Sequence, residues 1–433
     1  MIVNFAQRAH NHNFEADWIV RSLLDTDFYK LLMLQFIWKH YARLPVTFSL
    51  INRTTRISLA AQIDEAELRR QLDHARSLRF RRSELTWLAG NSFYGRRGIF
   101  EPAFIDWLSG FHLPEYRLDY RDGQVALCFE GVWSETTMWE VPALSIVNEL
   151  RTRTNLARMS EFELDLFYAH AKAKLWSKIN TLRGIGDLAV SDFGTRRRHS
   201  FLWQEYVVGA MAAELGKSFT GTSNVFLALK HDLEAIGTNA HELPMVLAAL
   251  ESDRGGLRDA QYRVLELWQQ TYGGALLVML PDTFGSAQFL ANAPSWATDW
   301  TGIRIDSKDP FLAGEEYIDW LQARGADPGT KRVLFSDGLD VDDIVALHRQ
   351  FGGRIKDGYG WGTLLTNDFR GFHPRGASDF EPISLVCKVT EAAGRPVVKL
   401  SDNSGKATGS AAEIARYRKV FGQAGIARAP VLV

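Results

Sequence analysis

The sequence has little cysteine, no excess of either charge and no long apolar run. Its two cysteines, Cys128 and Cys387, are too few for a disulfide framework or a four-cysteine zinc site, so we expect small core residues in a reducing compartment. Lysine and arginine number 50 against 51 acidic residues, which leaves no basic field to hold a nucleic acid. No signal-peptide pattern opens the chain, and its most apolar stretch, residues 275–280, is too short to cross a bilayer. These absences predict a soluble, cytoplasmic protein that binds neither nucleic acid nor membrane.

What the sequence does contain is typical of a folded globular protein, with 46% hydrophobic and 23% charged residues. Its 433 residues allow two or three domains. Residues 46–51 alternate as in a strand, and residues 116–120 and 124–130 form two more strand-like runs. Asp-Gly at positions 122–123 joins the last two and strongly favours a β-hairpin. With helical stretches between these runs, such as residues 63–78, the sequence predicts an N-terminal α+β domain.

The middle of the chain, residues 187–363, has a different pattern. Short apolar runs end in small or acidic residues, and each is followed by a helical period. Alternating strands and helices predict a parallel sheet, and seven repeats predict an irregular or incomplete α/β barrel whose strand ends meet at one mouth. The seven segments are LAVSDFG, SFTGTSN, AIGTNAHE, LLVMLPDTFGS, GIRIDSKDP, VLFSDGLD and KDGYGWGT.

A second predicted hairpin lies near the C-terminus, where residues 383–389 and 396–400 flank a glycine turn. We expect it to pair with the N-terminal sheet, which makes the first domain discontinuous. The predicted division is an N-terminal α+β domain (residues 1–145), an α/β barrel (146–375) and a C-terminal segment that packs back on the first domain (376–433).

Acidic residues follow many of the predicted barrel strands. Carboxylates that converge beside glycine-rich loops suit a Mg²⁺ ion bridging phosphates and ribose hydroxyls, because Mg²⁺ prefers oxygen ligands. The alternative is that each aspartate caps the helix that follows it. The candidates are Asp192, Asp282, Asp306, Asp309, Asp337 and Asp340.

Two glycine-bearing segments, residues 336–338 and 358–363, come late in the series. They are candidates for a phosphate site built from backbone N–H groups, and ordinary turns are the alternative. The run Arg196, Arg197 and Arg198 could clamp a phosphate or a carboxylate, or could be a solvated charge run.

His241 follows a predicted strand end and stands beside Glu242, a carboxylate that could fix its tautomer. A neutral imidazole can act as a nucleophile, and a structural histidine is the alternative. His10 and His12 have no strand or glycine context, so we expect no metal role for them.

Seven motifs, in the same order and across nearly the whole chain, resemble those of nicotinate phosphoribosyltransferase. Each motif alone is a weak indicator of this family, but the seven together are specific for it. The resemblance implies a type II phosphoribosyltransferase fold, an N-terminal α/β domain packed against an α/β barrel, in a homodimer whose subunits share their active sites. The motifs are SLLDTDFYK (22–30), WEVPAL (139–144), DFGTRRR (192–198), GTSN (221–224), GTNAHE (237–242), LFSDGLD (334–340) and KLSDNSGK (399–406).

The resemblance also implies roles for individual residues. Phe193 and Tyr29, the latter from the neighbouring subunit, would sandwich the pyridine ring. Arg196 would bind near the substrate carboxylate or the diphosphate. His241 falls on the histidine that the family phosphorylates.

Further roles concern the phosphoribosyl donor and the acceptor pocket. Arg304 and Asp306 would line the ribose and diphosphate, while Asp282 and Asp306 would reach Mg²⁺ through phosphates or water. The 5′-phosphate would rest on the backbone around Gly338 and Gly360 to Gly362. The remaining substrate-binding candidates are Thr222, Ser223 and Asp337.

The sequence departs from the family pattern at two places. Where the family reads like HDSGDP, this chain has Ile305 before Asp306, and Lys308 in the glycine position. Lys308 could neutralise phosphate charge or obstruct the loop. Pro281 precedes Asp282, which is tolerable at a strand end.

The resemblance therefore implies ATP-coupled transfer of phosphoribosyl from 5-phosphoribosyl 1-diphosphate to nicotinate, with Mg²⁺ as cofactor and ATP as co-substrate. Nicotinate is favoured because related nicotinamide enzymes carry aspartate in the position of Ser223, and a carboxylate there would repel the acid.

Three other functions remain open at this stage. One is the nicotinamide enzyme of the same fold. Another is a sugar-phosphate aldolase or isomerase barrel, for which Lys308 is the one candidate Schiff-base lysine at a strand end. The third is a barrel that only binds a metabolite.

Overall fold

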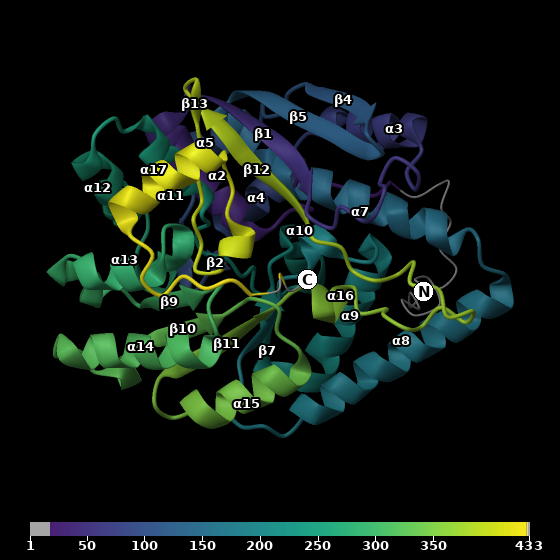
Figure 1. The fold of residues 1–433 in the computed structure, drawn as a ribbon. Coiled ribbons are helices and arrows are strands. Elements are labelled where there is room, and N and C mark those ends of the chain that lie inside the picture. Colours follow the sequence, from purple (N-terminus) through teal and green to yellow (C-terminus); the bar gives the residue numbers. More distant parts are fainter. Residues whose placement is uncertain (1–17, 430, 432–433) are drawn as a thin grey trace.

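Two β-sheets organise the chain, and the computed structural model describes residues 18–429 and 431 (Figure 1). The first sheet is antiparallel, with the order β13-β12-β1-β5-β4. Its strands are β1 (Pro45–Asn52), β4 (Tyr116–Arg121), β5 (Gln124–Val132), β12 (Leu385–Ala392) and β13 (Arg395–Pro396).

The predicted β4–β5 hairpin is confirmed. Asp122 and Gly123 form its turn with φ of 51° and 73°, the left-handed values that a two-residue hairpin turn requires. The short segment between the strands therefore sets the register of the sheet.

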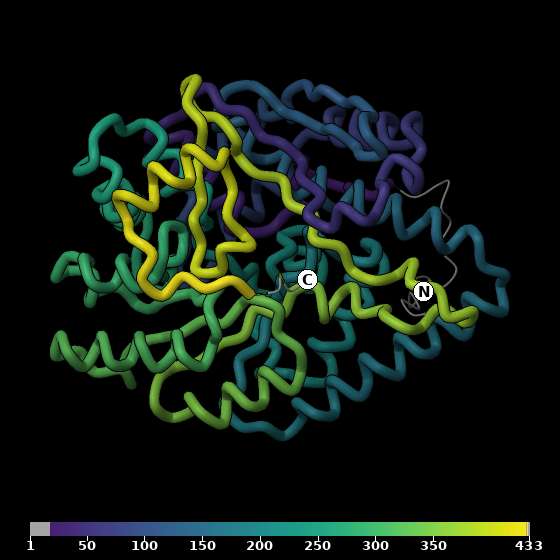
Figure 2. Tube along the Cα trace, in the orientation of Figure 1, coloured from purple at the N-terminus to yellow at the C-terminus, as the bar shows by residue number. Residues whose placement is uncertain are grey.

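The C-terminal hairpin pairs with the N-terminal sheet, as predicted, because β12 runs antiparallel to β1 with Leu50 opposite Cys387. Its second strand is shorter than predicted, since β13 ends at Pro396. Beyond it the backbone turns to other partners, and the N–H of Leu400 donates to the carbonyl of Thr283. Figure 2 shows this yellow segment running from the antiparallel sheet to the second sheet.

The second sheet has six strands, all parallel, in the order β7-β6-β11-β10-β9-β8. No pairing among the described residues closes β7 against β8, so the predicted incomplete α/β barrel is an open sheet. The strands are β6 (Val190–Asp192), β7 (Phe219–Thr222), β8 (Val278–Met279), β9 (Gly302–Ile305), β10 (Arg332–Phe335) and β11 (Lys356–Trp361).

The prediction of a seventh strand, at AIGTNAHE, is wrong. That segment makes a single bridge, from Ala235 to Thr222. The reason lies at Gly237, where a Cβ atom would stand 2.5 Å from the backbone nitrogen of Tyr29. This close approach directs the segment against the start of helix α2 instead of along the sheet.

Helices surround both sheets (Figure 1). Helix α7 lies between the two halves of the molecule, with nearly every side chain buried, and it contacts both β12 and the loop after β6. The helices up to α7 are α2 (Phe28–Tyr41), α3 (Glu65–Ser77), α4 (Arg82–Gly90), α5 (Pro102–Leu108), α6 (Trp133–Thr136) and α7 (Glu140–Leu156). The later helices are α8 (Glu161–Leu182), α9 (Phe201–Leu215), α10 (Val225–His231), α11 (Glu242–Leu250), α12 (Arg254–Thr271), α13 (Ser286–Asn292), α14 (Pro310–Ala323), α15 (Val341–Phe351), α16 (Thr363–Thr366) and α17 (Ala411–Phe421).

Two of the candidate metal-binding aspartates are helix caps. The Asp340 carboxylate accepts from the N–H of Asp343, and the N–H of Asp340 donates to the Asp343 carboxylate, a capping box that begins α15. Asp309 accepts from the N–H of Leu312 and begins α14. Both carboxylates accept hydrogen bonds from backbone N–H groups at the N-terminus of a helix. For these two aspartates the alternative interpretation, helix capping, is therefore confirmed.

None of the helices in the described part of the chain combines the length and the apolar character needed to cross a membrane.

Candidate active site

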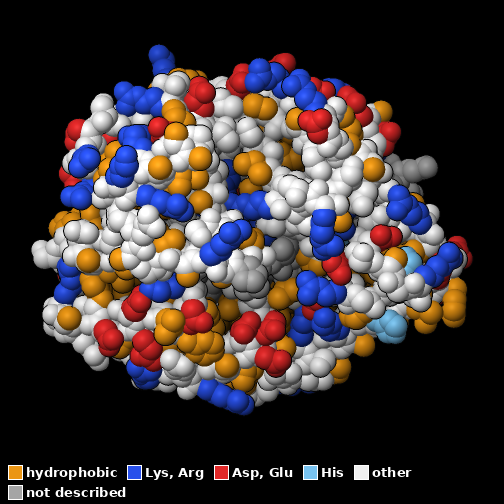
Figure 3. All heavy atoms as spheres, viewed as in Figure 1, with side chains coloured by type: hydrophobic (Ala, Val, Ile, Leu, Met, Phe, Trp, Pro, Cys, Tyr) orange, Lys and Arg blue, Asp and Glu red, His pale blue; other side chains and the backbone are white. Residues whose placement is uncertain are grey.

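One cavity lies where the carboxyl ends of the parallel strands meet the antiparallel sheet. It receives side chains from α2, α7, the loops after β6, β9, β10 and β11, strand β12 and the C-terminal segment. Figure 3 shows Lys and Arg side chains gathered above the centre of this face and Asp and Glu side chains below it. The fold therefore brings to one place groups that are hundreds of residues apart in sequence.

Two aromatic rings line the cavity, Phe193 after β6 and Tyr29 at the start of α2. The N–H of Phe193 donates to the carbonyl of Trp361 at 2.8 Å, and the Tyr29 hydroxyl donates to Glu140 at 3.0 Å. Both rings belong to the same chain. The expectation that Tyr29 must come from a neighbouring subunit is therefore wrong, and a homodimer stays a prediction that nothing in a single chain tests.

Gly360 does not line the cavity, contrary to its predicted role at a phosphate. A Cβ atom at this position would lie 2.4 Å from the Phe193 ring. The glycine therefore makes room for an aromatic ring.

The three consecutive arginines of the DFGTRRR segment have different surroundings, and none is part of a solvated charge run. Arg196 reaches into the cavity, with its Nε 3.3 Å from Asp27 and Nη1 3.6 Å from Glu140. Arg197 also lines the cavity, where burial and the neighbouring Arg196 lower its pKa to about 10.

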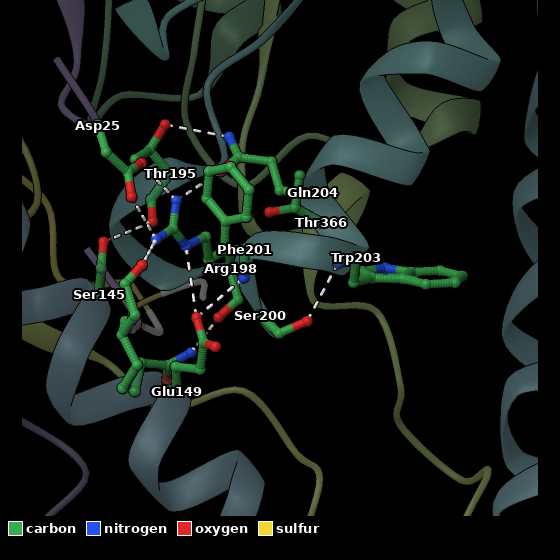
Figure 4. Close-up of polar contacts among 12 residues, drawn as sticks. Asp25, Ser145, Glu149, Thr195, Arg198, Ser200, Phe201, Trp203, Gln204 and Thr366 are labelled. Atoms are coloured by element: carbon green, nitrogen blue, oxygen red, sulfur yellow. Dashed lines mark hydrogen bonds and ion pairs between the residues drawn. The ribbon is translucent and has the colours of Figure 1, made fainter. Parts of the chain in front are cut away.

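Arg198 is fully buried, and Figure 4 shows its contacts with Asp25 and Glu149. Its guanidinium binds both oxygens of Asp25, at 2.7 and 2.9 Å, and its Nε lies 3.7 Å from Glu149. A bidentate arginine–carboxylate pair has a fixed geometry. Arg198 therefore anchors the turn that carries Phe193 and Arg196.

Asp192, another candidate metal ligand, belongs to the same buried network. Burial raises its pKa to about 6, although Thr222, Gln204 and the N–H of Gly194 all donate to it. Thr222 is thereby turned away from the cavity, so its predicted contact with substrate is wrong. Asp192 and Thr222 therefore stabilise the loop after β6 from the side that faces away from the cavity.

Ser223 does line the cavity, as predicted, but its hydroxyl already donates to Asp27 at 2.7 Å. Asp27 lines the cavity too. The sequence argument for an acid acceptor assumed no carboxylate at this end of the pocket. The structure places the Asp27 carboxylate there, because Asp27 is the N-cap residue of α2.

His241 stands just before α11, with Nε2 2.6 Å from Asp282 Oδ1 and 3.1 Å from Lys399 Nζ. Burial lowers the pKa of His241 to about 4, and the Lys399 charge adds to that effect against the opposing Asp282. The imidazole is therefore neutral at pH 7, as a nucleophile must be.

Glu242 does not fix the His241 tautomer, contrary to the sequence hypothesis. It accepts instead from Trp133, Thr137 and the buried Lys30, each at 2.6 Å. The residue that orients His241 is Asp282, which follows β8 and accepts from the Ser307 hydroxyl at 2.5 Å.

Tyr94 also holds the histidine loop. Its hydroxyl donates to the carbonyl of Gly237 at 2.8 Å and accepts from the N–H of the same residue at 2.7 Å. Tyr94 has a φ of 52°, in the left-handed region, within the short hairpin of β2 (Ser92–Phe93) and β3 (Arg96–Arg97).

His241, Asp282 and Asp306 bring their ligand atoms within 4.8 Å of one another. Both oxygens of Asp282 already have partners, and the Lys399 ammonium lies 3.4 Å from one of them. A cation inside the cluster opposes direct coordination of a metal by all three residues. The donor set fits Mg²⁺ held mainly through phosphate oxygens or water, with Asp306 as the more available carboxylate.

The remaining predicted residues of the donor site meet at the cavity. Arg304, Asp306, Asp337, Gly338 and Gly362 all line it. Burial raises the pKa of Asp337, and the ion pair with Lys406 opposes that rise.

Four cationic residues that the sequence analysis missed form a basic wall of the cavity, from β12, the residue after β1 and the C-terminal segment, and two of them reach the aspartates: Lys399 lies 3.4 Å from Asp282, and Lys406 pairs with Asp337. Burial lowers the pKa of Lys388 well below its usual range, and Lys399 adds to this. Lys388 interrupts the apolar residues 385–389 at the start of β12, a signal that could have found it. The wall consists of Arg53, Lys388, Lys399 and Lys406.

Lys308 neither neutralises a phosphate site nor obstructs the loop. Its ammonium is paired with both oxygens of Glu316, at 2.5 and 2.6 Å, and it does not line the cavity. Of the cysteines, Cys387 is buried as expected and Cys128 is partly exposed, and both are free. His10 and His12 lie outside the described residues.

A cavity at the carboxyl ends of parallel strands, with aromatic walls at one end and cations and strand-end aspartates at the other, is typical of an α/β protein whose site suits a flat ring beside a phosphorylated group. Residues 24–148 match the nicotinate phosphoribosyltransferase N-terminal domain, and residues 188–424 match the nicotinate phosphoribosyltransferase (NAPRTase) family. The chain belongs to the nicotinate phosphoribosyltransferase family.

Solved structures agree with this assignment. The chain is similar to the nicotinate phosphoribosyltransferase of Vibrio cholerae, with 32% identity over 94% of each chain and a TM-score of 0.84. It is also similar to that of Porphyromonas gingivalis, with 29% identity over 93% of this chain and 100% of the other, and a TM-score of 0.81.

Proposed function

We propose that this protein transfers phosphoribosyl from 5-phosphoribosyl 1-diphosphate to the ring nitrogen of nicotinate, forming nicotinate mononucleotide and diphosphate for NAD biosynthesis in the cytoplasm. The observation that carries the proposal is a single cavity that joins two aromatic walls, Phe193 and Tyr29, to a basic wall and to strand-end aspartates. Family membership supports the same reaction.

The acceptor ring would lie between Phe193 and Tyr29, and Arg196 would attract its carboxylate. Holding a flat ring between two buried aromatic faces fixes the direction of its nitrogen. Because binding has already restricted the motion of both substrates, the entropy loss of a bimolecular encounter no longer adds to the barrier of the transfer step. This effect accounts for much of the rate enhancement in transfers of this kind.

The donor would occupy the other end of the cavity. The basic wall would bind the diphosphate, and the backbone at Gly338 and Gly362 would receive the 5′-phosphate. Mg²⁺, when bound beside Asp306, supplies charge neutralisation for the diphosphate as it leaves. Fixed cations in a water-poor site stabilise that developing charge, and no residue has to act as nucleophile in this step.

ATP coupling would use His241. The neutral imidazole would attack the γ-phosphorus of ATP, the bond to ADP would break, and water would later cleave the phosphoramidate to release phosphate. The added charge of about −1.5 to −2, by analogy with other phosphorylated side chains, would reorganise Mg²⁺ and diphosphate contacts beside Asp282 and Asp306.

A second acceptor, nicotinamide, is favoured by one observation. Asp27 puts a carboxylate at the end of the pocket that holds Ser223, where it could accept from an amide N–H. The aldolase alternative loses support, because Lys308 is paired with Glu316 away from the cavity.

The test incubates the purified protein with 5-phosphoribosyl 1-diphosphate, Mg²⁺ and equimolar nicotinate and nicotinamide, with and without ATP. We expect nicotinate mononucleotide as the main product and faster turnover with ATP. Nicotinamide mononucleotide as the main product would support the second candidate, and tight ligand binding without any turnover would favour a binding protein.

A parallel test of ATP coupling uses His241→Asn. We expect this variant to fold, to keep slow transfer and to lose ATP hydrolysis. Hydrolysis at the parental rate would show that His241 is structural.

A further inference from the structure

The acceptor end of the cavity contains a carboxylate that an anionic acceptor would have to meet. Asp27 is 2% exposed and its Oδ1 accepts from the Ser223 hydroxyl at 2.7 Å. An acid such as nicotinate, ionised at neutral pH, would bring a second carboxylate to the same place. Two buried like charges so close together oppose binding, so one of them has to be neutralised.

The charged and titratable groups around Asp27 come from several elements. Arg196, in the loop after β6, is its ion-pair partner, with Nε 3.3 Å from Oδ2. Glu140 on α7 competes for the same guanidinium at 3.6 Å, and Tyr29 on α2 adds a neutral phenol. Asp192 at the end of β6 contributes a further negative charge. Below them, Arg198 is held by both oxygens of Asp25.

Asp27 is the least compensated carboxylate that lines this end of the cavity. Glu140 has the fully buried Lys30 at 2.6 Å and the Tyr29 hydroxyl at 3.0 Å. The charges of Lys30 and Arg196, with hydrogen bonds from Lys30 and Tyr29, hold the pKa of Glu140 below its usual range against the effect of burial. The one ion pair of Asp27 among the described residues is with Arg196, whose side chain is 43% exposed, and the buried Arg198 adds a more distant positive charge. Burial raises the pKa of Asp27, while Arg196, Ser223 and Thr195 oppose that rise.

Asp192 is the other candidate for a proton, since burial raises its pKa to about 6. It lies behind the loop, where Thr222, Gln204 and the N–H of Gly194 donate to it, and it does not line the cavity. A bound acceptor therefore meets Asp27 and not Asp192.

We propose that Asp27 takes up a proton from solvent when an anionic acceptor binds, so that its carboxylic acid form faces the acceptor's carboxylate. The acid then donates a hydrogen bond where the carboxylate would repel. This inference rests on the proposed function, because it assumes that an acid such as nicotinate is the acceptor. It resolves how a pocket with a built-in carboxylate can accept an anion.

The consequence is a defined pH dependence. Below the pKa of Asp27 in the free protein, this carboxyl is already protonated and its contribution to nicotinate affinity does not change with pH. Above that pKa, each bound nicotinate costs the uptake of a proton, and affinity falls by up to about tenfold per pH unit until the pKa of the complex is reached.

Calorimetry measures directly how many protons the protein takes up when the acceptor binds. Nicotinate is titrated into the protein at one pH in buffers of different ionisation enthalpy, and the slope of the observed enthalpy gives the protons taken up per site. We expect net uptake with nicotinate and with pyridine-3-sulfonate, which is also anionic, and none with neutral nicotinamide. The KM for nicotinate, measured from pH 6 to 9, gives the same information during turnover.

Four variants identify the group that takes up the proton. Asp27→Asn should abolish uptake and should bind nicotinate at least as tightly as the parent at high pH, a gain that loss of a structural contact would not produce. Ser223→Ala removes a donor to ionised Asp27, so it should move the fall in affinity to higher pH. Glu140→Gln and Asp192→Asn are matched controls that should keep the uptake.

The outcomes separate the inference from the proposed function. Nicotinate that binds and turns over with no proton uptake and a flat KM profile overturns the inference alone. Uptake that persists in Asp27→Asn and disappears in Asp192→Asn overturns it as well. No binding or turnover of nicotinate at any pH overturns the proposed function.

Discussion

Replacing Gly360 by alanine tests whether this glycine serves the aromatic wall or a phosphate. The new Cβ would lie 2.4 Å from Cδ2 and Cε2 of the Phe193 ring. Carbon atoms in contact are about 3.5–4.0 Å apart, so the ring has to move by about 1 Å. The backbone of Phe193 is fixed by its bond to Trp361, and the space beside the ring is the cavity itself.

The expected magnitude follows from overpacking. Extra methyl groups in a well-packed site cost about 1–3 kcal/mol, which corresponds to about a 5- to 140-fold change in an equilibrium constant. We expect this loss in the binding of the acceptor ring, because the ring is what the displaced Phe193 would contact. The donor phosphates bind at the other end of the cavity, so the KM for 5-phosphoribosyl 1-diphosphate should change little.

Steady-state kinetics with each substrate varied in turn measures the two effects. Gly358→Ala is the matched control, since its Cβ would meet Leu334 at an ordinary 3.5 Å on the same buried strand. It should leave both KM values near the parental ones. A rise in the KM for the phosphoribosyl donor alone in Gly360→Ala would refute the reasoning and restore the role of Gly360 at a phosphate.

Three further outcomes follow from the site. Phe193→Ala should weaken nicotinate binding more than donor binding, because ring stacking adds about 0.5–1.5 kcal/mol beyond the buried area; equal losses in the two KM values would make Phe193 a core residue only. Arg198→Met leaves Asp25 buried without its cation and should lower the free energy of unfolding in urea by about 3–5 kcal/mol, and the double variant with Asp25→Asn should recover part of that loss. Mixing a Tyr29→Ala chain with an Arg304→Ala chain should restore no activity, because both side chains line the cavity of one chain; recovery in the mixture would mean that subunits share their sites after all.

Local signals in the sequence predicted local structure well. Asp-Gly at positions 122–123 predicted the β4–β5 hairpin because the turn needs two left-handed residues, and the capping alternative for Asp340 is the one that the start of α15 confirms. These features depend on neighbours in sequence. The strand predicted before His241 failed because Gly237 packs against α2, a contact that no local pattern reveals.

The same limit applies to the site. The sequence analysis named His241 correctly but paired it with the adjacent Glu242, whereas the carboxylate that orients it, Asp282, lies 41 positions away. It found the acidic edge of the cavity, where each aspartate follows a strand, and missed the basic wall. Arg53 and Lys388 face the cavity only because β1 and β12 pair across most of the chain.

That pairing has a consequence for how the protein forms on the ribosome. Val46 cannot pair with Ala392, its partner across β1 and β12, until nearly the whole chain has been synthesised. Until then β1 has β5 on one side and an open edge on the other, which is a surface prone to pairing with other chains. Contacts this distant in sequence form slowly. The basic wall is therefore completed last, and a nascent chain stalled before residue 385 would carry the two aromatic rings of the cavity with three of the four residues of the basic wall missing.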